Sequence, residues 1–244
     1  MKRVLFAAVL AGIVAAVPSA LGRDPVEPPR TCEGLTICGP IAGPWVVVPG
    51  PARGAGTASS VWMLECPKGV VGGTDARVGD GWVDVTFEGR VGAPVNPGIT
   101  TGRMVVFTGM SVGPAGRPSS FIPFAGCIPS EGGPRAPTAV GAPRASASPQ
   151  FGPRQPVVRR IRVIDLQRRR VSARFSCKRG ERLVSVATSI GLYTARRPSV
   201  SQLRGVRVTR SVVVGKIFVT AERVGLSRRV PVEVQVHALC AGAG

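Results

Sequence analysis

The chain has 244 residues, of which 32 are lysine or arginine and 13 are aspartate or glutamate, so its formal net charge is +19. A single histidine and six cysteines without a CxxC pair exclude a zinc site of the usual Cys/His kind. The 32 glycines and 23 prolines recur too often for long helices, so we expect an all-β protein without a metal or cofactor.

Residues 1–22 have the pattern of an export signal. Lys2 and Arg3 precede the apolar run 4–17, and Ala20-Leu21-Gly22 provides a small-x-small cleavage site. This run is shorter than the ~20 apolar residues that cross a bilayer, and no later stretch is long enough. We therefore expect cleavage near Gly22, a secreted or extracytoplasmic protein, no transmembrane segment in the mature chain and a flexible N-terminus over 23–31.

A neutral β unit is expected over residues 32–130. Trp45 to Val48 is a short, wholly apolar run, which is typical of a strand covered on both faces. Residues 83–87 alternate between apolar and polar side chains, the pattern of a half-buried strand. Residues 23–150 hold ten Lys/Arg and nine Asp/Glu, a net of +1.

The next segment, residues 131–156, is predicted to be a disordered linker, because it holds six prolines and four glycines without an apolar period. The charge changes across it: residues 151–244 hold twenty Lys/Arg and four Asp/Glu, a net of +16. Linkers and changes of composition that coincide are typical of domain boundaries.

A strongly basic β unit is expected over residues 157–244. The segments 157–164 and 171–176 are predicted to form a hairpin that turns near Asp165. Residues 232–236 alternate as a half-buried strand does, which places His237 on the outward face.

An internal repeat relates the two units. Gly215 to Cys240 aligns with Gly102 to Cys127 without a gap, at an offset of 113, and glycine, valine, proline, alanine and cysteine recur in place. We therefore predict two small disulfide-closed, β-sandwich-like units joined by the Pro/Gly-rich linker. The alternative is one pseudo-symmetric sandwich formed from both units.

The repeat also selects a disulfide pattern among the fifteen that six cysteines allow. Equivalent cysteines should make equivalent bonds, which predicts Cys66–Cys127 and Cys177–Cys240 and leaves Cys32–Cys38. Closing loops of the two larger sizes contributes on the order of 4 kcal/mol each in the chain-entropy account.

The arginines of the basic unit are the leading candidate site, because the guanidinium fork matches phosphate and carboxylate groups. We hypothesise that this unit adheres to an anionic cell-surface or extracellular polymer, and the alternative is a solvated cationic face whose arginines reflect codon usage. Scattered aromatic residues offer no stacking platform, so no sequence-specific nucleic-acid partner is expected. The candidate residues are Arg159, Arg160, Arg162, Arg168, Arg169, Arg170, Arg196, Arg197, Arg228 and Arg229.

A second candidate is the strand face of Trp82, Asp84 and Glu88. A tryptophan beside carboxylates could stack on a sugar ring, or the carboxylates could hold calcium, which predicts a carbohydrate-binding or calcium-stabilised module. A secreted hydrolase that uses these carboxylates is a third hypothesis. Carboxylates exposed along one strand lack the burial that separates two pKa values, and no GxSxG or HExxH motif is present, so we expect a protein that is not an enzyme.

Overall fold

The computed structural model describes residues 39–54, 57–67, 69–89, 102–128 and 157–242. The predicted signal peptide, the flexible segment 23–31, the Cys32–Cys38 bond and the linker 131–156 lie outside the described residues. Within them the protein is all-β, as the sequence predicts, with one four-residue helix. None of the helical structure described is long and apolar enough to cross a membrane.

The described residues of the N-terminal half (residues 39–128) form seven strands: β1 (Gly39–Ala42), β2 (Trp45–Val48), β3 (Ser59–Glu65), β4 (Val70–Val78), β5 (Val83–Gly89), β6 (Met104–Ser111) and β7 (Ser119–Ile128). The C-terminal half (residues 157–242) contains six strands and the helix: β8 (Val157–Asp165), β9 (Arg170–Ser176), β10 (Glu181–Leu192), α1 (Val200–Leu203), β11 (Val206–Val213), β12 (Lys216–Arg223) and β13 (Val232–Gly242).

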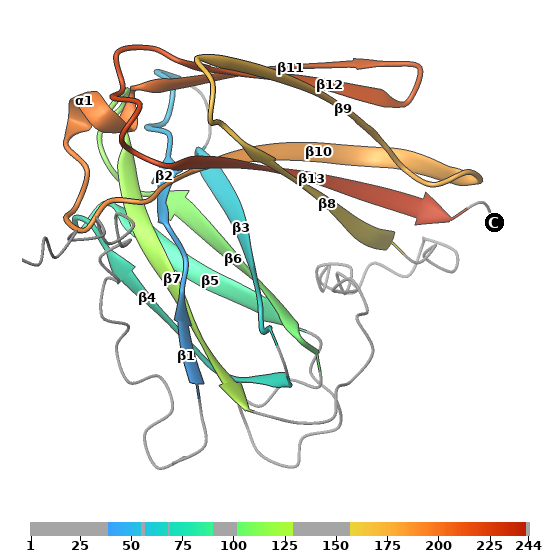
Figure 1. Ribbon diagram of the computed structural model, residues 1–244, viewed down its shortest axis with the longest axis horizontal. Coiled ribbons are helices and arrows are strands. Elements are labelled where there is room, and N and C mark those ends of the chain that lie inside the picture. The colour runs from blue at the N-terminus through green and yellow to red at the C-terminus, as the bar shows by residue number, and fades with distance from the viewer. Residues whose placement is uncertain (1–38, 55–56, 68, 90–101, 129–156, 243–244) are drawn as a thin grey trace, which may run out of the picture.

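One seven-stranded sheet runs through both halves (Figure 1). Its order is β1-β7-β2-β10-β13-β8, and β4 pairs with β7. Two three-stranded sheets, β3-β6-β5 and β11-β12-β9, complete the fold, one from each half. Every strand pair in the three sheets is antiparallel.

Strand β2 joins the halves, because it pairs with β7 on one side and with β10 on the other. All four of its residues are buried, which confirms the prediction of a strand covered on both faces. Since side chains alternate along a strand, Trp45 and Val47 point into one hydrophobic cluster and Val46 and Val48 into another. Four consecutive apolar residues are what this position requires.

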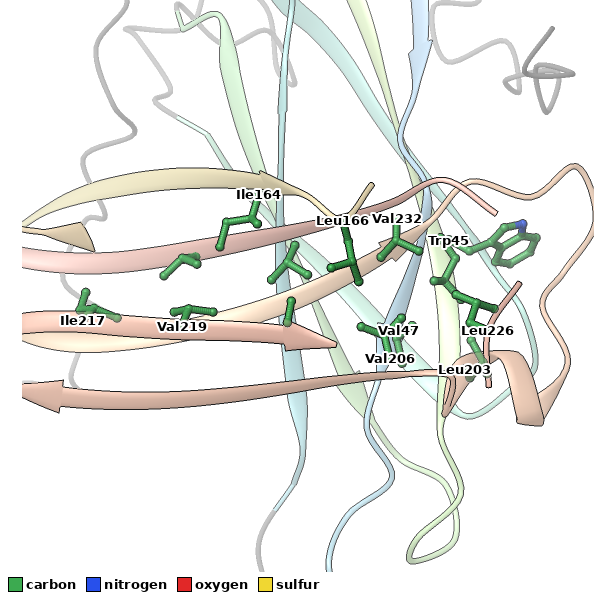
Figure 2. Packing of buried hydrophobic residues seen from close by; sticks show 14 of the residues in the cluster. Trp45, Val47, Ile164, Leu166, Leu203, Val206, Ile217, Val219, Leu226 and Val232 are labelled. Carbon is green, nitrogen blue, oxygen red and sulfur yellow. The ribbon is translucent and has the colours of Figure 1, made fainter. Parts of the chain in front are cut away.

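The first cluster lies between the large sheet and β11-β12-β9. Figure 2 shows Val47 of β2 beside Val206 of β11, and Trp45 near Leu226. Ile122 and Phe124 of β7 belong to the same cluster. The core of the C-terminal half is thus completed by side chains of the N-terminal half.

The second cluster fills the space between β3-β6-β5 and the N-terminal part of the large sheet. Trp62, Phe107 and Phe121 are its largest members, and each is at most 1% exposed. Gly109 leaves room for this packing, because a Cβ at that position would lie 2.5 Å from the Phe121 ring.

Two of the three predicted disulfides are present, and both join two sheets across a cluster. Cys66, directly after β3, bonds Cys127 of β7, and Cys177, directly after β9, bonds Cys240 of β13. They close loops of 61 and 63 residues. The prediction of this pairing is confirmed.

The predicted hairpin of residues 157–164 and 171–176 is wrong. Strand β8 pairs with β13 in the large sheet, whereas β9 pairs with β12 in the small one. The turn near Asp165 therefore carries the chain from the large sheet to the small sheet β11-β12-β9. Leu166 at this turn is fully buried in the core, which fixes the crossing.

His237 does not lie on an outward face, because β3 of the N-terminal half contacts that side of β13. The His237 side chain is 1% exposed, and burial first and the nearby Arg159 second lower its pKa to about 3. Its neighbour Gln235 accepts a hydrogen bond from the Met63 N–H at 2.8 Å and donates one to the Met63 carbonyl at 3.1 Å. A strand with polar alternation is thus buried on both faces.

Candidate anion-binding site

Of the ten candidate arginines, eight are exposed, and four pair with carboxylates: Arg159, Arg160, Arg169 and Arg197. The exposed ones lie on β8, in the β8–β9 connection, on β9, after β10 and after β12: Arg162, Arg168, Arg169, Arg170, Arg196, Arg197, Arg228 and Arg229. Their surroundings decide which of them could share a ligand.

Arg159 and Arg197 connect the halves. Arg159 is 7% exposed and its Nη2 lies 3.7 Å from Glu88 of β5, and burial lowers the pKa of its guanidinium more than Glu88 raises it. Arg197 forms an ion pair with Asp80, which also accepts a hydrogen bond from the Ser119 hydroxyl. Both arginines are part of the interface between the halves.

Arg160 is bound within its own half. Its Nε donates to Glu181 Oε2 at 2.6 Å, and its Nη2 donates to the other carboxylate oxygen. Chiefly because of this fork, the pKa of Glu181 falls from 4.5 to about 2, and the backbone N–H of Lys178 also lowers it. Arg160 is therefore held by a bidentate partner within the C-terminal half.

The Glu181→Gln variant is expected to show what this pair adds to stability at different pH values. A carboxylate whose pKa is lower in the folded state stabilises fully above its ordinary pKa of 4.5, and that stabilisation disappears as the pH falls toward about 2. The difference in stability between wild type and variant should therefore be largest above pH 5 and should shrink below it. Urea unfolding from pH 7 to pH 2.5 measures this, and a constant difference would contradict the pairing.

Four arginines converge on one pocket at the end of the β11-β12-β9 sheet. The pocket has a volume of about 460 Å³ and is lined by Arg169, Arg207, Glu222, Arg223, Val224, Gly225, Leu226 and Arg228. Arg169 and Arg228 were predicted, and the structure brings them together from the β8–β9 connection and the β12–β13 connection. Four cations and one carboxylate give the lining a net charge of +3.

Arg207 and Arg223 were missed as candidates. Arg207 stands on the polar side of the alternating segment 206–209, so its exposure could have been predicted. Arg223 is 6% exposed and nothing in the sequence separates it from the other arginines. Only the packing of the loops around it reveals its position.

Arg223 holds the pocket together. Its guanidinium donates to the Leu166 carbonyl at 2.6 and 3.1 Å, to the Ser227 carbonyl at 3.0 Å and to the Val230 carbonyl at 2.9 Å. These bonds connect the β8–β9 turn to the loop after β12. Burial lowers the pKa of its guanidinium most, the charge of Asp165 opposes this as the next largest effect, and the charge of Arg228 adds a smaller lowering. Arg223 thus adds a fixed positive charge to the lining of the pocket.

Glu222 is the one carboxylate among the residues that line the pocket, and arginines lie around it. It stands opposite Arg170 on β9 and Arg207 on β11, and its carboxylate lies 3.8 Å from Arg169 Nε. Three cations therefore surround one carboxylate. A ligand with several anionic groups would meet an excess of positive charge here, and guanidinium groups bind phosphate and carboxylate oxygens in pairs.

The second candidate set is not gathered into one cluster. Trp82, 41% exposed, lies before β5 and packs against Gly113, where a Cβ would be 2.8 Å from that of Trp82. Asp84 is exposed and Glu88 faces Arg159. Among the described residues, one cluster of potential metal ligands has its ligand atoms close enough together to hold an ion: Cys177, Glu181 and Cys240. The sulfurs of its two cysteines are joined to each other in a disulfide.

The arginine pocket is therefore the best-formed candidate site in the part of the chain that the structure describes. The positive charge of the pocket and the planar fork of each guanidinium group determine which ligands it could bind. Comparisons of the chain with protein-family models, curated proteins and solved structures found no match.

Proposed function

We propose that the protein binds an anionic polymer or surface outside the cytoplasm through the pocket of Arg169, Arg207, Arg223 and Arg228. The observation that carries this proposal is the convergence of four guanidinium groups on one pocket that holds a single carboxylate. The two disulfides are compatible with an oxidising compartment.

Charge on the whole half supports the same partner class. Residues 157–242 contain nineteen Lys/Arg and four Asp/Glu, a net of +15. A field of this size attracts anions over about a Debye length, about 8 Å at physiological salt, and the pocket then supplies short contacts. Phosphate and carboxylate polymers share this chemistry.

We also propose that the N-terminal half serves as a scaffold, and that the two halves are copies of one unit. In each half the middle strand of the small sheet, β6 or β12, pairs with both of its neighbours. In each half a disulfide also joins the residue directly after the small sheet's outer strand, β3 or β9, to β7 or β13. The copies would then differ in surface charge while sharing the scaffold.

Arg207→Gln/Arg228→Gln is expected to weaken retention on immobilised polyphosphate or polygalacturonate at least tenfold. Removing two contacts to anionic groups should also lower the slope of log K against log salt concentration by roughly 1.5. The full chain is used, and a salt series measures both quantities. The two polymers distinguish phosphate from carboxylate ligands.

The matched control is Arg162→Gln/Arg174→Gln, which removes two exposed charges that do not line the pocket. The control should bind nearly as wild type. Equal losses in the two variants would show that net charge alone causes binding, and the pocket would then have no special role.

A further inference from the structure

The turn between β11 and β12 exposes three consecutive valines. Val212, Val213 and Val214 are 48%, 54% and 94% exposed. Side chains of this kind are normally covered, and an exposed apolar group of several neighbours marks a contact surface. The turn lies at the end of the C-terminal half that faces away from α1 (Figure 1).

The backbone of this turn is unusual for a valine. Val213 pairs with Lys216, so Val214 and Gly215 form a two-residue turn, and both have positive φ, 48° and 71°. Such turns favour asparagine, aspartate or glycine at the first position, and a β-branched residue there is strained. The local fold therefore does not account for valine at position 214.

Cations surround the valine tip. Arg210 and Lys216 flank it along the chain. Lys216 pairs with Ser176, so the β9–β10 turn with Lys178 and Arg179 lies beside it, and Figure 1 shows both turns at the same end. Glu181, the carboxylate that follows this turn, is already held by Arg160. The end of the half thus combines an apolar tip with several nearby cations, of which Lys178 also lies close to Glu181.

These features identify the kind of partner. A soluble polyanion would use the cations and leave the valines in water. A second copy of the chain would bring two halves of net +15 together, which their charges oppose. An anionic lipid surface uses both features, because valines enter the apolar layer while lysine and arginine remain at the headgroup phosphates.

We propose that the tip of the β11–β12 hairpin, residues 212–216, inserts into the outer layer of an anionic lipid membrane. Lys178, Arg179 and Lys216 contact the headgroups. This site is distinct from the arginine pocket, since Val213 lies six positions after Arg207 along β11, a distance of about 20 Å. The two sites lie at opposite ends of one small sheet.

The test is co-sedimentation of the full chain with vesicles of phosphatidylglycerol and phosphatidylcholine. We expect Val213→Asn/Val214→Asn to bind at least tenfold more weakly than wild type. The single Val214→Asn variant should unfold at a higher denaturant concentration than wild type, because asparagine tolerates positive φ, while binding the vesicles less tightly. Stability and binding that change in opposite directions separate a lipid contact from a folding defect.

Two controls complete the experiment. Val163→Asn removes a valine that is 47% exposed on β8, and it should bind as wild type. Arg207→Gln/Arg228→Gln should keep its vesicle binding if the tip is the contact. Wild-type binding by the tip variant, no wild-type binding to the anionic vesicles, or loss of binding in the pocket variant alone would each overturn the proposal.

Discussion

Replacing Cys177 and Cys240 by serine is expected to lower the free energy of unfolding by about 4 kcal/mol, since a loop of 63 residues is no longer closed in the unfolded chain. For a chain of this size, this corresponds to a fall in Tm of roughly 10 °C. Cys240 is fully buried, so the serine there also loses apolar contact with the core. Urea unfolding of the full chain measures the change.

The control is the reducing agent. Dithiothreitol should destabilise wild type more than it destabilises the double variant, because the variant retains only the Cys66–Cys127 bond of the two described here. A loss below about 1 kcal/mol would contradict the loop-closure account.

The Arg223→Met variant is expected to lose about 3 kcal/mol of stability. Methionine fills much of the same space, but the carbonyls of Leu166, Ser227 and Val230 lose their donor in a buried or half-buried setting. An acceptor left without a partner costs about 1–3 kcal/mol. Thermal unfolding at pH 7 measures this loss.

Arg223→Lys distinguishes charge from geometry. Lysine keeps the cation but lacks the planar fork that reaches three carbonyls at once. We expect it to lose nearly as much stability as methionine. A fully stable lysine variant would show that the charge, rather than the hydrogen bonds, holds the loops.

Much of the architecture could be predicted because its signals are local. Glycine and proline spacing and period-2 alternation indicate strands, and Trp45 to Val48 required a partner on each face. The cysteine pairs followed from their repeated spacing. In each case a few neighbouring residues, or one alignment, contained the information.

The predictions that were wrong share a physical cause: residues far away in the sequence pack against the segments concerned. Polar positions such as Gln235 and His237 were expected to face solvent, but backbone groups of Met63 satisfy Gln235, 172 residues away. A buried polar residue with a satisfied partner has the same sequence pattern as an exposed one. The segment 157–164 was paired with its neighbour in sequence for a similar reason, because the alternation of a strand does not identify its sheet.

The residues that line the arginine pocket could be predicted only in part from the sequence. Arg169 and Arg228 line the pocket, whereas Arg197 is bound by Asp80, 117 residues away. No spacing along the chain distinguishes these arginines. The acidic residues of the N-terminal half that hold Arg159 and Arg197 were instead assigned to other hypotheses or left without a partner.

Sharing β2 between the halves has a consequence for protein engineering. The pocket's sheet packs on a core that includes Trp45 and Val47 of β2 and Ile122 and Phe124 of β7. Residues 157–242 alone would therefore expose a gap where four large side chains belong. A portable version of the arginine pocket has to bring these two strands with it, so the smallest transplantable module extends well beyond the basic segment of the sequence.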